Sequence, residues 1–181
     1  MVIDSPVWRA RLPDAPARCR RWARAALRAG GFDLARWPGA RAAELAILLA
    51  DDAALRRLNR DYRGRDEPTN VLAFAATATG APPGVAGTRK PAAAPPTVAL
   101  GDVAIAYETM AYEAASQGKT RAAHLAHLVI HGVLHLLGYD HMAKAQTIDM
   151  EILETALLAR YGVKDPYRMR PRRAPRGTAR T

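Results

Sequence analysis

The residues best suited to chemistry are concentrated in one short stretch, because all five histidines of the chain lie within residues 124–141. Three of them occur in the sequence HGVLHLLGYDH, with the spacing His-x3-His-x5-His. Side chains four positions apart share one face of a helix, with Cβ atoms roughly 5–6 Å apart, so His131 and His135 are expected to bind one metal ion together. Gly138 is suited to the left-handed conformation that ends a helix, which would bring His141 to the same ion.

Three imidazole ligands predict a zinc site with an open coordination position, because structural zinc sites normally have four protein ligands. The expected cofactor is one Zn²⁺ ion on His131, His135 and His141, which are predicted to be both metal ligands and catalytic residues. With this set complete, His124 and His127 are not expected to be ligands. His127 is interpreted either as a support or substrate contact of the site or as a partly buried histidine without chemistry.

The residue after the first of these ligands is Gly132, where zinc peptidases with a similar helix carry a catalytic glutamate. Peptide hydrolysis needs that general base to activate water and to protonate a poor leaving group. A metal ion lowers the pKa of its water towards ~7 and can therefore support phosphodiester cleavage without a carboxylate. That reaction also needs positive charge beside the phosphate. The pattern therefore disfavours a metallopeptidase and favours a nuclease.

The charge balance points in the same direction, since Lys and Arg outnumber Asp and Glu by 27 to 17. A net charge of +10 favours RNA or DNA as partner, and an anionic membrane surface second. Arginine-rich coding without any partner is the alternative interpretation. Residues 168–181 hold six arginines and are expected to form a basic disordered tail. The single cysteine, Cys19, and the lack of a signal or of ~18 consecutive apolar residues predict a cytoplasmic protein without membrane contact.

The elements that position these residues follow an α+β pattern, and 181 residues suit a single domain, predicted here as residues 1–167. Residues 75–97 hold many prolines and glycines and are expected to form a flexible loop. The apolar runs and periodicities predict strands at residues 2–8, 43–50, 69–75 and 97–106, and helices at 16–29, 53–62, 107–117, 121–137 and about 144–161.

Three blocks of this sequence resemble the YbeY family of metal-dependent endoribonucleases, which mature bacterial ribosomal RNA. They are HGVLHLLGYDH, LNRDYRGRDEPTNVLAF at residues 58–74 and LGDVAIA at residues 100–106, in the order and rough spacing of the family. The resemblance covers about residues 42–167. It implies a small mixed β-sheet packed with helices, in which the histidine helix is similar to that of zinc peptidases (zincin-like).

The resemblance also selects one arginine. In the sequence DYRGRD, a guanidinium that grips phosphate oxygens is the expected catalytic group, but the residues alone leave Arg57, Arg60, Arg63 and Arg65 equal. The family's functionally important arginine stands in the same YRG context, which implies a catalytic role for Arg63. The chain departs from the family at Ala73, where a serine is usual, so any hydroxyl contribution at that position is absent.

Several nearby polar residues are interpreted as supports and not as catalytic groups. Asp66, Thr69 and Asn70 lie in the turn sequence DEPTN, where they can satisfy local backbone groups. Asp102 either orients a ligand histidine or makes a structural hydrogen bond, and Asp140, beside a ligand, has the same two interpretations.

The function predicted from the residues and the resemblance together is a single-strand-specific, zinc-dependent endoribonuclease. The resemblance implies action on ribosomal RNA precursors in late small-subunit maturation and in ribosome quality control, beside a ribosomal protein or a ribosome-associated GTPase. The alternatives are a zinc-containing ribosome-assembly or RNA-binding factor without catalysis and, less favoured, a metallopeptidase. The cleavage site, the oligomeric state and the nucleophile (metal hydroxide or the RNA 2′-hydroxyl) stay open.

Overall fold

A computed structural model describes residues 1–76, 97–139 and 144–167. The interior of the predicted 75–97 loop, the basic tail from residue 168, and the predicted site residues Asp140 and His141 lie outside the described residues. The elements in chain order are β1 Val2–Ile3, α1 Pro6–Arg11, α2 Ala15–Ala29, the 3-10 helix η1 Leu34–Arg36, β2 Ala42–Ala50, α3 Asp52–Arg63, β3 Val71–Ala75, β4 Thr97–Ala106, α4 Tyr107–Ser116, α5 Arg121–Leu136 and α6 Lys144–Ala159.

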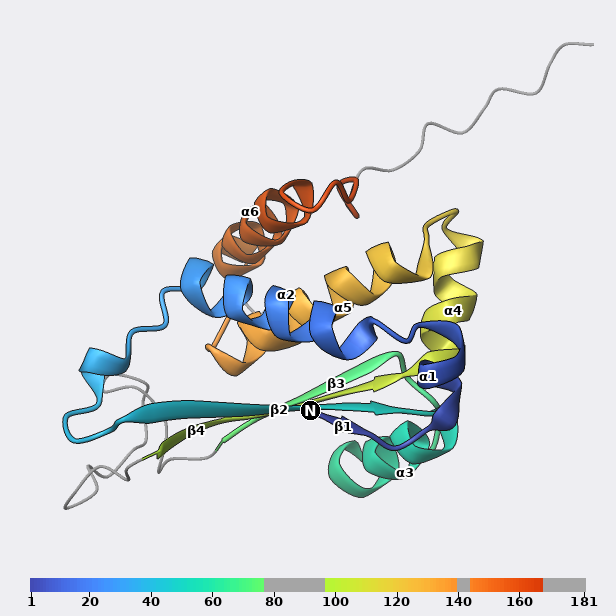
Figure 1. Ribbon diagram of the computed structural model, residues 1–181, viewed down its shortest axis with the longest axis horizontal. Helices are drawn as coiled ribbons and strands as arrows, with labels where there is room; N and C mark the ends of the chain where they lie inside the picture. The colour runs from blue at the N-terminus through green and yellow to red at the C-terminus, as the bar shows by residue number, and fades with distance from the viewer. Residues whose placement is uncertain (77–96, 140–143, 168–181) are drawn as a thin grey trace, which may run out of the picture.

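The sheet is small and mixed, with the strand order β1-β2-β4-β3. Strands β1, β2 and β4 are parallel, whereas β3 is an edge strand that runs antiparallel to β4 and pairs Ala73 with Val103. Helices α2 and α5 lie side by side on one face of the sheet, α3 lies on the other face, and α6 covers the helices from outside (Figure 1). The predicted α+β fold with a small mixed sheet in one domain is confirmed.

The main core fills the space between the sheet and the α2–α5 layer. Strand β4 contributes Val103 and Ile105, and α5 contributes a run of buried aliphatic residues that includes Val129, Ile130 and Val133. Such parallel strands, covered by helices on both faces, read as nearly continuous apolar runs, which explains why β2 and β4 were predictable. In the described part of the chain, no helix is both long and apolar enough to span a membrane.

The predicted first strand, residues 2–8, is wrong beyond Ile3. After β1 the chain turns at Ser5, whose backbone is extended, and α1 begins at Pro6. Proline suits the first turn of a helix because its missing N–H has no intrahelical partner there. The indole of Trp8 on α1 is fully buried and donates a hydrogen bond of 2.8 Å to the carbonyl of Ala50, so this short helix is fixed against the end of β2.

Candidate metal centre and catalytic cleft

Helix α5 carries the described histidines. It begins where the hydroxyl of Thr120 accepts a hydrogen bond from the Ala123 N–H, and its apolar residues pack against the sheet and α2. His131 and His135 lie one turn apart and only partly buried, and their Nε2 atoms are 3.1 Å apart. The predicted pairing of these two imidazoles is therefore present in the geometry.

The separation of the two Nε2 atoms fits a shared metal ion. Two nitrogens, each ~2.0–2.1 Å from a tetrahedral zinc ion, lie ~3.3 Å from one another. The 3.1 Å between the two Nε2 atoms, which face each other at hydrogen-bond distance, is close to that value. The pair could thus bind zinc with little rearrangement.

A buried carboxylate holds the other nitrogen of His131. Glu154, on α6, is 0 % exposed, and its Oε1 lies 2.8 Å from Nδ1 of His131. Its Oε2 lies 3.3 Å from Nε2 of His127 and accepts a hydrogen bond from the hydroxyl of Tyr167. A metal-binding histidine commonly donates its second N–H to a carboxylate, which fixes the ring and raises the basicity of the nitrogen on the metal.

The protonation states of this cluster agree with that arrangement. Burial alone would raise the pKa of Glu154, but the nearby His127 imidazole and the hydrogen bond to His131 outweigh it and lower the pKa to about 2. Burial, together with the neighbouring Glu154 carboxylate, raises the pKa of Tyr167, so its phenol keeps the proton that it donates. An ionised Glu154 can only accept, so Nδ1–H of His131 is the donor of this hydrogen bond, and Nε2 is the nitrogen of His131 that faces His135.

The same cluster also offers a second possible ligand set. Ligand atoms of His127, His131 and Glu154 all lie within 4.8 Å of one another and could hold a metal ion. This set shares only His131 with the predicted one, and it was not foreseen from the sequence. The predicted set has His135, which lines the cleft described below, and His141 in place of His127 and Glu154.

Two glycines shape the helix around these ligands. A Cβ atom at Gly132 would lie 2.7 Å from Cγ1 of Val103, so α5 approaches β4 too closely for any side chain at this position. A glutamate there, as in a peptidase, would collide with the sheet. Gly138 has a φ of +90°, and its N–H bonds the carbonyl of His135 at 3.0 Å, so the predicted turn after the helix is confirmed.

A cleft of about 500 Å³ opens beside the two histidines. It is lined by Arg63, Val71, Ala73, Ala75, His131, Gly132, His135, Gly138 and Tyr139. Arg63 is the last residue of α3, on the opposite face of the sheet from α5, and it reaches the cleft at the β3 edge. The fold thus places an exposed guanidinium and the histidine pair on one cavity, although they are far apart in the sequence. Ala73 lies in the same cleft.

The other arginines near Arg63 are placed differently. Arg56 forms an ion pair with Asp66 at 2.8 Å, and Arg60 forms one with Asp61 at 2.9 Å. Neither Arg56 nor Arg60 lines the cleft, and Arg57 and Arg65 are absent from its lining as well. Of the four arginines that the sequence left equal, Arg63 is the one that lines the cleft together with His131 and His135 in the described part of the chain.

The polar residues interpreted as supports have structural partners. Asp66 binds Arg56, and the side chain of Asn70 donates to Glu113 at 2.8 Å. Asp102 lines a different cavity with Leu58 and Tyr62, on the α3 side of the sheet, because neighbouring residues of a strand point to opposite faces. Asp102 therefore does not orient a ligand histidine, and Glu154 lies in that position instead.

Glu154 is the residue that sequence reasoning missed, although a signal was present. Met150, Glu154, Leu157 and Leu158 are all buried, and their spacing is that of one helix face. An acidic residue on such a stripe is almost never fully buried unless it is paired. The acid inside the apolar face of α6 was thus the available clue, but nothing in the sequence said which histidines it would meet.

Comparison with known proteins decides the family. The family model described as "Endoribonuclease YbeY" matches residues 14–162. The chain belongs to this family. A protein named Endoribonuclease YbeY from Paramagnetospirillum magneticum is 53% identical over 165 residues, which cover 91% of this chain and 92% of the relative. The one from Rhodospirillum rubrum is 48% identical, with 88% and 76% of the two chains covered.

The YbeY resemblance of the three sequence blocks is confirmed, and the chain is a member of a family of endoribonucleases, hydrolases of phosphodiester bonds. A further relative of that name, from Alkalilimnicola ehrlichii, is 49% identical, with 90% and 86% of the chains covered. The fold is similar to the solution structure of a Thermotoga maritima protein, with a TM-score of 0.51, 17% identity, and 93% and 98% of the two chains covered. That last likeness concerns the fold alone.

Proposed function

We propose that this YbeY-family protein is a single-strand-specific, zinc-dependent endoribonuclease that acts on ribosomal RNA precursors. Its proposed roles are late small-subunit RNA maturation and ribosome quality control in the cytoplasm. The observation that carries the proposal is the cleft that joins Arg63 to the pair of His131 and His135. Metal ligands and a cation on one open cavity are what phosphodiester cleavage requires.

The proposed metal ligands are His131, His135 and His141, and the proposed ion is Zn²⁺. The 3.1 Å between the Nε2 atoms of the first two supports this assignment, as does the hydrogen bond that commits Nδ1 of His131 to Glu154. When bound, zinc supplies Lewis acidity towards the phosphodiester and lowers the pKa of water. His127 and Glu154 are assigned to the support of His131.

The proposed role of Arg63 is to bind the scissile phosphate and to stabilise the charge that develops on it. A guanidinium is permanently charged and presents its N–H groups to two phosphate oxygens at once. Gly132 supports this chemistry over peptide hydrolysis, because Val103 leaves no room there for a carboxylate. The nucleophile is either water or the 2′-hydroxyl of the RNA, and the two are distinguished by their products.

The remaining parts of the proposal come from the family and the charge balance. The proposed substrate is single-stranded precursor RNA, and the proposed partner is a ribosomal protein or a ribosome-associated GTPase. The catalytic domain is taken to span residues 1–167, and the basic tail of residues 168–181 to add phosphate contacts outside the cleft.

The test is cleavage of a single-stranded ribosomal RNA fragment by four identically prepared proteins: the wild type, His135→Ala, Arg63→Ala and Arg57→Ala. Removing one group that stabilises transition-state charge costs about 10²–10³ in rate, so Arg63→Ala should be slower by that factor. His135→Ala should be inactive, and Arg57→Ala, which removes an exposed arginine outside the cleft, should keep wild-type activity.

Equal cleavage by all four would mean a contaminating ribonuclease and would contradict the proposal. Zinc binding without cleavage by the wild type would favour the non-catalytic assembly factor. Products that end in a 2′,3′-cyclic phosphate would identify the 2′-hydroxyl as nucleophile and exclude direct attack by water.

A further inference from the structure

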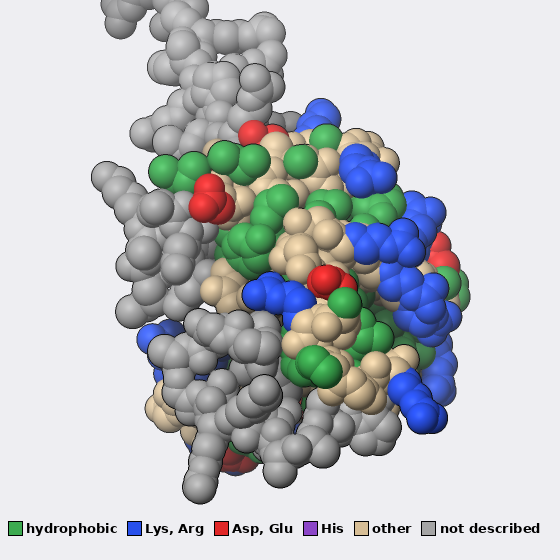
Figure 2. Space-filling model, turned by 90° about the vertical axis from the view of Figure 1, so that its left-hand side faces the viewer, with side chains coloured by type: hydrophobic (Ala, Val, Ile, Leu, Met, Phe, Trp, Pro, Cys, Tyr) green, Lys and Arg blue, Asp and Glu red, His purple; other side chains and the backbone are tan. Residues whose placement is uncertain are grey.

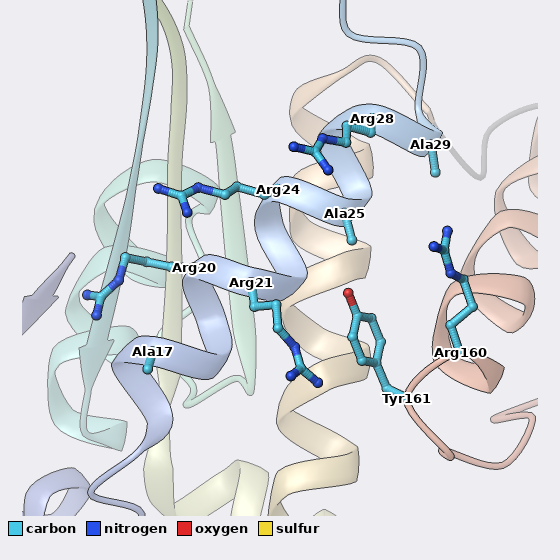
Figure 3. Close-up of a pocket in the computed structure, with 9 residues that line it drawn as sticks. All are labelled: Ala17, Arg20, Arg21, Arg24, Ala25, Arg28, Ala29, Arg160 and Tyr161. Atoms are coloured by element: carbon cyan, nitrogen blue, oxygen red, sulfur yellow. The ribbon is translucent and has the colours of Figure 1, made fainter.

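A second cavity, of about 700 Å³, lies between α2 and the end of α6. Arg20, Arg21, Arg24, Arg28 and Arg160 line it, together with Tyr161 and three alanines of α2. Among the described residues, no acidic side chain lines this arginine groove. In Figure 3, Arg21 reaches towards Tyr161, and Ala25 and Ala29 face Tyr161 and Arg160, whereas the guanidinium groups of Arg20, Arg24 and Arg28 extend from the other side of α2. The groove shares no lining residue with the metal cleft.

Helical spacing creates the long side of the groove. Arg20, Arg24 and Arg28 are four positions apart and therefore form one row on α2, each step rising ~6 Å along the helix axis. The opposite side of α2 is buried through Cys19, Trp22 and Ala26, so the row is fixed in its outward direction. On the face drawn in Figure 2, Lys and Arg side chains gather along the right-hand edge.

Stability does not account for this row. Like charges four positions apart on a helix repel each other and weaken it. Helix α3 balances its charges, because Arg56 and Arg60 pair with aspartates. In the described residues, by contrast, none of the groove arginines forms an ion pair, and the only pair on α2 joins Arg18 to Asp14 at the helix start. The row is thus suited to a negative charge from outside the chain.

The far side of the groove is held in place by aromatic contacts. The guanidinium of Arg21 lies 4.8 Å from the centre of the Tyr161 ring, an arrangement favourable to both groups. The same ring makes an edge contact with the buried Trp22, at 6.4 Å between centroids. Tyr161 and Arg21 are therefore positioned before any ligand arrives, and the hydroxyl of Tyr161 points into the gap (Figure 3).

We propose that this arginine groove is a second RNA-binding site, which holds backbone phosphates on the flank of α5 opposite to the metal cleft. Arginine and tyrosine are among the side chains that contact phosphates without reading sequence. A membrane-binding helix would need large apolar residues beside its cations. The large apolar residues of α2 are buried, and the apolar residues that α2 contributes to the groove are alanines. The cleft lies at the β3 edge and α2 lies across α5 from it, so a long RNA can contact both.

The proposal rests on the proposed function in one respect, that the substrate is RNA. Its test measures binding and not cleavage. The groove variant carries Arg20→Gln, Arg24→Gln and Arg28→Gln, and a matched control carries Arg9→Gln, Arg41→Gln and Arg57→Gln. The control removes the same charge from exposed arginines on separate parts of the surface. Both triple variants also carry His135→Ala, so that the labelled single-stranded RNA stays intact, and both are checked for unchanged melting temperature.

Affinity is measured by fluorescence anisotropy over a series of salt concentrations. Each phosphate contact on single-stranded nucleic acid contributes ~0.7 to the slope of log K against log salt, so the groove variant should lose about 2 units of slope. The control should keep the slope of the His135→Ala parent. Equal losses of slope in the two triple variants would show that only net charge matters and would overturn the proposal. An unchanged slope in both variants would overturn it as well.

Two further measurements separate this proposal from others. Unchanged RNA affinity, with weakened binding to phosphatidylserine vesicles or to polyglutamate, would make the groove a surface for lipid or protein and overturn the RNA assignment. With His135 restored, the groove variant should cleave a short oligonucleotide at the wild-type rate, since such a substrate occupies only the cleft. If the wild type cleaves nothing but the groove variant still loses RNA affinity, the nuclease function fails and the groove assignment stands.

Discussion

Two histidines on α5 each bind a carboxylate of a neighbouring helix, with different consequences. Near the helix start, Nε2 of His124 lies 2.7 Å from Glu113, and its Nδ1 is buried without a hydrogen-bond partner among the described residues. Two turns later, Nδ1 of His131 lies 2.8 Å from Glu154, and its Nε2 points towards His135. A carboxylate partner does not by itself make a histidine functional, and what decides is the surroundings of the other nitrogen.

The two ends of the helix also differ in their access to solvent. The His124 side chain is 4% exposed, and burial lowers its pKa, partly offset by the hydrogen bond to Glu113, so it is enclosed in the fold and away from the cleft. Glu113 also accepts a hydrogen bond from Asn70, which joins α4 and α5 to the start of β3. The His131 side chain is 24% exposed and lines the cleft. The first end is enclosed within the fold, and the second lies at the cleft where the metal site is proposed.

The largest contrast is expected from the same substitution at the two carboxylates. Glu154→Gln keeps the shape of the side chain but removes the charge that holds His131 and His127. Loss of such a partner typically costs 10–100-fold in metal affinity, so zinc should bind about 10–100-fold more weakly, measured by competition with a chromophoric chelator. Glu113→Gln should leave zinc affinity unchanged. Equal effects of the two variants would contradict the division between the two ends of α5.

A smaller effect, on stability alone, is expected at the other end of the helix. His124→Ala removes the partner of Glu113, which should lower the free energy of unfolding by about 1–3 kcal/mol, measured by urea denaturation. Zinc affinity, measured under conditions in which nearly all of the variant is folded, should stay at the wild-type value, because His124 lies away from the cleft. A drop in affinity comparable to that of Glu154→Gln would place His124 in the metal site after all.

An effect on both stability and zinc affinity, weaker than that of Glu154→Gln on zinc, is expected from Tyr167→Phe, which removes one of the hydrogen bonds to Glu154 and keeps the ring. The hydroxyl donates to a charged group, so its loss should lower the free energy of unfolding by about 1.5–3 kcal/mol and zinc affinity by less than Glu154→Gln does. Chelator competition on the three proteins should give zinc affinities that decrease from the wild type to Tyr167→Phe to Glu154→Gln. A Tyr167→Phe affinity below that of Glu154→Gln would show that the phenol, and not the carboxylate, positions His131.

The sequence was sufficient for features that depend on local pattern. The spacing of His131 and His135 predicts their shared face, and Gly138 predicts the turn that follows, because both depend on neighbours within one helix. The apolar runs of β2 and β4 likewise predict buried strands. Family resemblance then singled out Arg63 among several arginines, which spacing alone could not do.

Features that depend on packing between distant segments were missed. The segment after Ile3 reads as a strand from its apolar residues, yet Pro6 begins a helix that the Trp8–Ala50 hydrogen bond fixes in place. Glu154 lies 23 positions after His131 in the chain and contacts it only because α6 packs on α5. The close approach of Gly132 to Val103 is equally invisible in the sequence, since no local rule places α5 against β4.

The most direct test of the central claim compares two single variants that separate the two possible ligand sets. His127, His131 and Glu154 could hold an ion together, whereas the proposed site uses His131, His135 and His141. Zinc affinity is measured by chelator competition for the wild type, His127→Ala and His141→Ala. The account predicts a large loss for His141→Ala and at most a modest one for His127→Ala, which only supports His131. Loss of zinc binding in His127→Ala, with wild-type affinity in His141→Ala, would contradict it.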